Sequence, residues 1–109
     1  MERRIGSRGQ VDFPVSALVD GFRHTCRAVD LSPTGMLLER TKSLASRTLN
    51  MLNALELRLD GERPIRMRAR TVWSQDRLQA VRFVVMHDVD RLEIAEHLDR
   101  MAKRREQLH

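Results

Sequence analysis

The sequence predicts a mainly β protein, a six-stranded antiparallel β-barrel followed by a C-terminal α-helix. Two features of its pattern predict this fold. Short runs of alternating apolar and polar residues are separated by turn signals, and after Val85 the apolar residues recur at helical spacing instead. A chain of 109 residues suits one domain with a single core. Closure, or near closure, of the sheet is expected because it removes exposed strand edges.

The first two strands are predicted to form a hairpin. Alternating residues place one face of the first strand toward the core: Phe13, Val15, Ala17 and Val19. Asp20-Gly21 follows, and this pair tolerates the positive φ values of a type I′ turn. The second strand is expected over residues 22–31, because Pro33 and Gly35 then break the pattern.

Four more strands are expected at residues 36–39, 52–59, 65–73 and 78–85. Residues 40–50 are polar and irregular, which predicts a loop, and turns are expected at Asp60-Gly61 and Gln75-Asp76-Arg77. In the fifth strand one predicted face carries Arg66, Arg68 and Arg70. The other carries Ile65, Met67, Ala69, Thr71 and Trp73.

The C-terminal helix is predicted at about residues 88–107. Asp90 can cap its start, with Glu93 three residues later completing a capping box. Its expected apolar stripe is Leu92, Ala95, Leu98 and Ala102, widened by Ile94 and Met101. The basic end at Lys103-Arg104-Arg105 suits the negative end of the helix dipole.

Arginine dominates the charge of this chain. The formal net charge is +5, and Lys42 and Lys103 are the only lysines among 20 basic residues. The planar guanidinium fork suits phosphate and guanine, although codon bias of the genome is an alternative explanation of the total count.

A cytoplasmic protein without membrane insertion is expected. No apolar stretch reaches the roughly 20 residues of a membrane span, and the basic start lacks the apolar segment of a signal peptide. Cys26 is the single cysteine, so no internal disulfide can form, and its alternating context predicts a buried packing role. The histidines lack metal-ligand spacing, so no metal site is predicted.

Two polar clusters carry the functional signal. Residues 1–10 are predicted to form a flexible arginine-rich ligand-binding arm, with Arg4 and Arg8 four residues apart, and residues 11–109 the barrel and helix. Each guanidinium can grip phosphate oxygens or the O6 and N7 atoms of guanine. Asp30 can accept from the amino and imino edge of guanine. Ser32 can donate to a phosphate oxygen, and Gly35 would let the backbone approach a ligand closely or adopt a positive φ at the turn.

Each cluster alone has a plain alternative. The arm could be a solvated basic tail. The string from Asp30 to Gly35 is also good turn chemistry without any ligand.

Together the clusters resemble the PilZ family, which binds the bacterial messenger cyclic di-GMP. That family is marked by RxxxR, here Arg4 to Arg8, followed by (D/N)xSxxG, here Asp30, Ser32 and Gly35, with 21 residues between the two motifs. The resemblance covers essentially the whole chain, because the family fold is a six-stranded antiparallel barrel with a C-terminal helix. The pattern at Val72-Trp73 and Val81 to Phe83 also resembles late strands of the family.

The resemblance implies specific roles. Arg4 and Arg8 would bind guanine and phosphate, Asp30 and Ser32 would bind from the barrel surface, and Gly35 would shape the turn. Arg3 matches an arginine that accompanies binding of an intercalated ligand dimer. Trp73 is either an aromatic wall of the site or a residue of the barrel core or rim.

The sequence departs from the family pattern at two places. Ala80 replaces a frequent glycine, and the stretch 44–53 lacks the glycine that commonly precedes the fourth strand. Both bear on strand register rather than on the ligand motif.

The functional hypothesis is a stand-alone cyclic di-GMP receptor without enzymatic activity and without cofactor. The arm is expected to become ordered on ligand binding and so to signal to an unidentified downstream protein. One alternative is a basic barrel that binds nucleic acid, favoured by the high pI and the row of arginines at 66, 68 and 70. The shortage of aromatic side chains for base stacking opposes it. Another alternative is a protein adaptor that needs no ligand.

Overall fold

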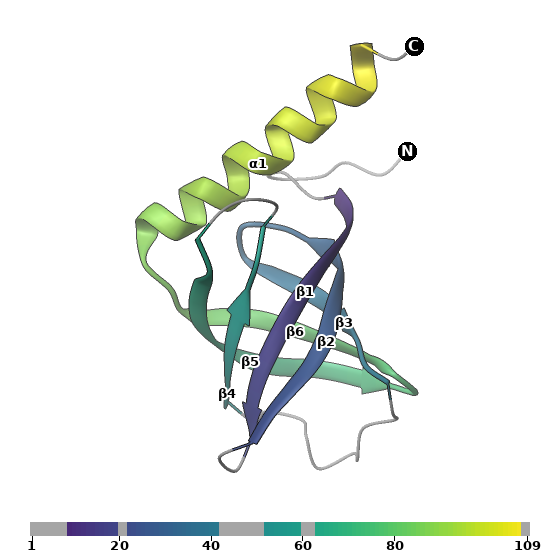
Figure 1. Ribbon diagram of the computed structural model, residues 1–109, viewed down its shortest axis with the longest axis vertical. Helices are drawn as coiled ribbons and strands as arrows, with labels where there is room; N and C mark the ends of the chain where they lie inside the picture. The colour runs from purple at the N-terminus through teal and green to yellow at the C-terminus, as the bar shows by residue number, and fades with distance from the viewer. Residues whose placement is uncertain (1–8, 20–21, 42–51, 60–62, 108–109) are drawn as a thin grey trace.

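A closed six-stranded barrel with a long helix at one end is observed in the computed structural model, which describes residues 9–19, 22–41, 52–59 and 63–107 (Figure 1). The strands are β1 (Gly9–Val19), β2 (Phe22–Leu31), β3 (Gly35–Glu39), β4 (Leu52–Leu57), β5 (Ile65–Gln75) and β6 (Leu78–Val85). The helix is α1 (Asp88–Gln107). The predicted fold class is therefore confirmed.

Antiparallel pairing runs around the barrel in the order β1-β2-β3-β6-β5-β4, and β1 pairs with β4 to close it. The turn after β5 is confirmed, and Asp76 there has a φ of 54°, a left-handed conformation that aspartate tolerates. The turns predicted at Asp20-Gly21 and Asp60-Gly61 lie outside the described residues, as does most of the loop predicted at 40–50.

Alternation along the strands fills the barrel interior. Phe13, Val15 and Ala17 are buried, as are Leu55, Leu57 and Leu59, whereas Arg66, Arg68 and Arg70 are exposed. The buried thiol of Cys26 belongs to the same core, as predicted. Each of these faces follows from the two-residue period of an extended strand.

The prediction that Trp73 shares the inward face of β5 is wrong. Ile65, Met67, Ala69 and Thr71 point into the barrel, but Trp73 is 43% exposed. The cause is an irregularity in the pairing of β5 with β6, where Thr71 pairs with Val81 and Trp73 with Ala80. Such a bulge adds one residue to β5, so the alternation resumes on the opposite face and Trp73 points outward.

The predicted helix range is confirmed, but two details of α1 are wrong. The helix begins at Asp88, so Asp90 lies within its first turn rather than capping it. The carboxylate of Asp90 is buried and pairs with Arg63, while the carbonyl oxygen of His87 accepts the first helical N–H groups. This ion pair replaces the expected capping box.

The apolar stripe of α1 is also rotated from its predicted position. Ile94 and Leu98 are buried and Met101 packs against the core, but Leu92 is 58% exposed. His97 joins the buried side, where its ring meets Phe13 edge to face at 5.4 Å. The helix therefore packs on the barrel end through residues at positions 94, 97, 98 and 101.

Candidate functional site

The turn between β2 and β3 is built around the hydroxyl of Ser32. Its Oγ accepts from the backbone N–H groups of Thr34 and Gly35, each at 3.2 Å. The Ser32 N–H donates to the carbonyl of Gly35 at 2.9 Å. Since the Ser32 oxygen accepts hydrogen bonds from the backbone, the hydroxyl proton is left to donate to another acceptor. That acceptor can be the Gly35 carbonyl oxygen, 3.2 Å from Oγ, or an oxygen of a ligand.

Gly35 is required by close packing of two backbones. A Cβ atom at this position would overlap the carbonyl oxygen of Val81 in the neighbouring strand β6. The φ angle of Gly35 lies outside the left-handed region, so the positive φ considered for this glycine is not adopted. The close approach observed is to the backbone of β6, and close approach to a ligand stays a prediction. The Thr34 carbonyl accepts from the Phe83 N–H at 2.9 Å and fastens the same turn to β6.

The start of β1 lies beside the acidic member of the motif. Gly9 pairs with Leu31, and Gln10 pairs with Asp30. Arg3, Arg4 and Arg8 lie outside the described residues, but Gly9 is the residue that follows Arg8 in the sequence. The strand pairing therefore fixes the root of the arginine-rich arm next to Asp30.

Four of the predicted site residues line one pocket. Asp30, Ser32, Gly35 and Trp73 border a hollow of about 200 Å³ on the outside of the barrel. Met36, Leu37, Ala80 and Val81 also line it. Asp30 is half-buried there, and its Oδ1 atom is enclosed by the protein.

The bulge in β5 explains the aromatic wall of this pocket. It turns the indole of Trp73 away from the core and toward the surface that carries Asp30. Alternation alone would have buried the ring, so a core position for Trp73 is excluded. The pocket thus combines a flat apolar surface, a carboxylate and a hydroxyl, groups that can stack on a purine ring and accept from its edge.

Three arginines near this turn were missed by the sequence analysis. Arg91 of α1 donates from Nη1 to the carbonyl oxygen of Pro33 at 2.8 Å. Arg105 donates to the carbonyl oxygen of Gln10 at 3.2 Å, next to the start of β1. Arg82 pairs across from Gly35 and is exposed. The partners of Arg91 and Arg105 have no local sequence signal because they depend on where the helix packs, and the neighbour of Arg82 depends on the pairing of β3 with β6.

Cys26 has the environment of a packing residue rather than of a reactive thiol. Burial raises the pKa of its thiol, and the charge of Arg40 opposes this only in part. A raised pKa keeps the thiol protonated near neutral pH, which lowers its nucleophilicity.

The family of the chain can be decided by comparison of its sequence. The family model described as "PilZ domain" matches residues 2–100. The chain belongs to the PilZ family. The match spans both clusters of the motif, including the arginines that precede β1. A search of curated proteins finds no match.

Two solved structures show the same PilZ fold. The first is the inhibitor of motility MotI/DgrA from Bacillus subtilis, with a TM-score of 0.81 and 16% identity. The match covers 95% of this chain but 53% of that one, so this chain spans about half the length of that protein. The second is the PilZ domain of CeSA from a cellulose-synthesizing bacterium, with a TM-score of 0.65 and 18% identity, covering 87% of this chain and 97% of that chain.

PilZ domains are receptor and effector domains for cyclic di-GMP rather than enzymes. In the described part of this chain no helix has the length and apolar character needed to cross a bilayer.

Proposed function

We propose that this protein is a stand-alone, cytoplasmic receptor for cyclic di-GMP that signals to a protein partner. The observation that supports the proposal is that Asp30, Ser32, Gly35 and Trp73 line one pocket and that the first residues of β1 pair beside it. Strand pairing sets Gly9 and Gln10 against Leu31 and Asp30, and Arg8 directly precedes Gly9 in the sequence.

Each group in the pocket has a counterpart on the messenger. The carboxylate of Asp30 accepts from the amino and imino groups of guanine, while Trp73 offers an aromatic surface to the base. Arg4 and Arg8 supply bidentate donors for guanine and for the phosphates. The Ser32 hydroxyl donates a hydrogen bond to a phosphate oxygen.

The proposed signal is an ordering of the arm against the barrel. Gly9 and Gln10, the last two residues of the predicted arm, already belong to β1. The residues before them are polar and include Gly6, so a dianionic ligand supplies the contacts that hold them in place. The contacts of Arg91 with Pro33 and of Arg105 with Gln10 join α1 to both sides of the site. A change at the turn or at the arm is thereby passed to the helix and to the outer surface.

Isothermal titration calorimetry with cyclic di-GMP tests the proposal. We expect binding by the unmodified protein and no measurable binding of cyclic di-AMP, because adenine lacks the O6 acceptor and the imino proton. Arg4→Ala or Arg8→Ala should abolish binding, and Asp30→Ala should weaken it severely. Loss of a charge-assisted bidentate contact costs about 1.5–3 kcal/mol, or roughly 10- to 150-fold in Kd.

The same titration measures stoichiometry and includes a control. Two messenger molecules per chain would support the role of Arg3 in binding an intercalated dimer, and one would count against it. Arg70→Ala, an exposed position outside the pocket, should bind like the unmodified protein. An Arg8→Ala variant with unchanged affinity would refute the proposed site.

A further inference from the structure

A second, larger groove lies at the other end of the barrel strands. Its volume is about 470 Å³, and its lining includes Leu18 of β1, Arg23 of β2, Glu56 of β4, Arg66 and Arg68 of β5, and Val85 of β6. This volume is within the usual range for binding pockets, roughly 300–1,000 Å³. Of the residues that the structure describes, none lines both the groove and the pocket at Asp30.

The two sites are separated along the same strands. Arg23 lies at the start of β2 and Asp30 near its end, a span of roughly 23 Å at about 3.3 Å per residue. Arg66 and Arg68 likewise lie early in β5, whereas Trp73 lies late. A molecule in the groove therefore leaves the messenger pocket open.

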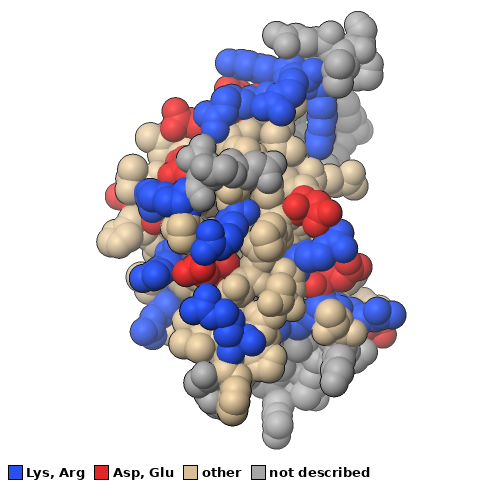
Figure 2. All heavy atoms as spheres, viewed as in Figure 1, with Lys and Arg blue, Asp and Glu red and all other residues tan. Residues whose placement is uncertain are grey.

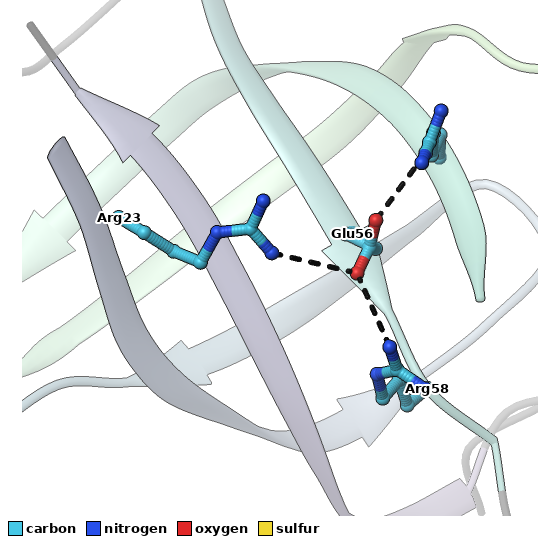
Figure 3. Close-up of polar contacts among 4 residues, drawn as sticks. Arg23, Glu56 and Arg58 are labelled. Carbon is cyan, nitrogen blue, oxygen red and sulfur yellow. Dashed lines mark hydrogen bonds and ion pairs between the residues drawn. The ribbon is translucent and has the colours of Figure 1, made fainter. Parts of the chain in front are cut away.

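One carboxylate in the groove is shared among three arginines, which lie in β2, in β5 and directly after β4. Glu56 lies 3.8 Å from Arg23, 3.8 Å from Arg58 and 3.3 Å from Arg66 (Figure 3). The Glu56 side chain is only 15% exposed, but those of Arg23, Arg58 and Arg66 are 57–84% exposed. A single carboxylate neutralises one guanidinium, so cationic donors remain available at the rim.

The lining as a whole is basic and partly apolar. Among the described lining residues three arginines face one glutamate, which gives these residues a net charge of +2. Figure 2 shows Lys and Arg side chains spread over the face that carries β1 and β4, with Asp and Glu side chains between them. Between the charges, Leu18 is 54% and Val85 57% exposed, and Met86 and Ala54 continue the apolar lining.

We propose that this groove binds an acidic, leucine-rich segment of a partner protein. Apolar anchors of the segment would fill the hollow at Leu18 and Val85, and its carboxylates would meet Arg23, Arg66 and Arg68. Nucleic acid fits less well, because no Phe or Trp lines the groove for base stacking and Glu56 repels phosphate. This interaction is independent of messenger binding at Asp30.

Selection from a displayed library of random 12-residue peptides on the full chain tests this inference. We expect enriched peptides to combine Asp or Glu with Leu, Ile or Phe. In 15N-resolved NMR spectra the best peptide should shift the amides of Leu18, Arg68 and Val85 and leave those of Ser32 and Gly35 unchanged. Arg68→Glu should weaken its Kd at least about tenfold, because the charge at the rim is reversed.

Arg70→Glu is the matched control, since it reverses the same charge two residues away on the same face of β5 but outside the groove. It should bind the peptide as the unmodified protein does, and so should Asp30→Ala, which separates this test from that of the messenger site. The inference is overturned if selected peptides carry no excess of acids, if Arg68→Glu binds them normally, or if a twelve-nucleotide thymidine oligomer gives the groove shifts that the peptide does not.

Discussion

Because Gly35 has no side chain, β3 can pack closely against β6 at this position. Its Cα lies so close to the Val81 carbonyl that a methyl group cannot fit without backbone movement. Gly35→Ala is expected to lower the free energy of unfolding by about 1–3 kcal/mol. Urea denaturation measures this, with Gln75→Ala at an exposed strand position as the control. Equal stability of the two variants would mean that the strands separate easily at the turn.

Cys26 is expected to make the fold sensitive to alkaline pH. Burial raises the pKa of the Cys26 thiol in the folded state. Below the ordinary thiol pKa of about 8.5 the thiol is protonated in both the folded and the unfolded chain, so it does not make stability depend on pH there. Above that pH the unfolded chain loses the proton first, so stability falls as pH rises toward the folded-state pKa. The chain has no tyrosine, so few other groups titrate there.

The measurement for Cys26 is the free energy of unfolding at pH 7.5, 9 and 10. The unmodified protein should lose more stability over this range than Cys26→Ala, whose side chain does not ionise. Parallel pH profiles of the two proteins would contradict the assigned burial of the thiol.

Among the secondary-structure elements, α1 packs on the barrel through one narrow face. Ile94→Ala should destabilise the protein by about 2–5 kcal/mol, because it leaves a cavity between helix and barrel. Leu92→Ala, in the same helix, should change stability little, since Leu92 is mostly exposed. Thermal unfolding of both variants checks this, and the reverse order would support the stripe predicted from sequence.

The strands were predictable from sequence where their pattern is regular. Ranges 22–31 and 78–85 agree with the structure, since alternation and the turn after Gln75 are local properties. The face of Trp73 was not predictable, because a bulge is decided by the pairing of β5 with β6. The burial of Asp90 was missed for a similar reason, since Arg63, its partner, is 27 residues away.

The site was predictable in part. Asp30, Ser32, Gly35 and Trp73 were named from motifs and do line one pocket. The roles of Arg91 and Arg105 were missed, because they arise from the position of the helix on the barrel. The contribution of Arg3, Arg4 and Arg8 remains a prediction for binding measurements.

At the scale of the whole molecule, closure of the barrel separates two surfaces. One end of β2, β5 and β6 carries the pocket of the PilZ motif, and the other end carries the basic groove around Glu56. The net charge of +5 favours approach of anionic molecules to either surface. The two surfaces differ in lining and size, and the proposals assign the messenger to the first and an acidic peptide to the second.

The fluorescence of Trp73 tests directly whether the arginine-rich arm and the turn between β2 and β3 form one messenger site. It is the only tryptophan of the chain and lines the proposed messenger pocket, so its emission reports on that pocket alone. Addition of cyclic di-GMP, with excitation at a wavelength that guanine does not absorb, should change the emission in a saturable way in the unmodified protein and not in Arg8→Ala. If the unmodified protein shows no change at saturating messenger, or if Arg8→Ala shows the same change, the arm and the turn do not form one receptor site.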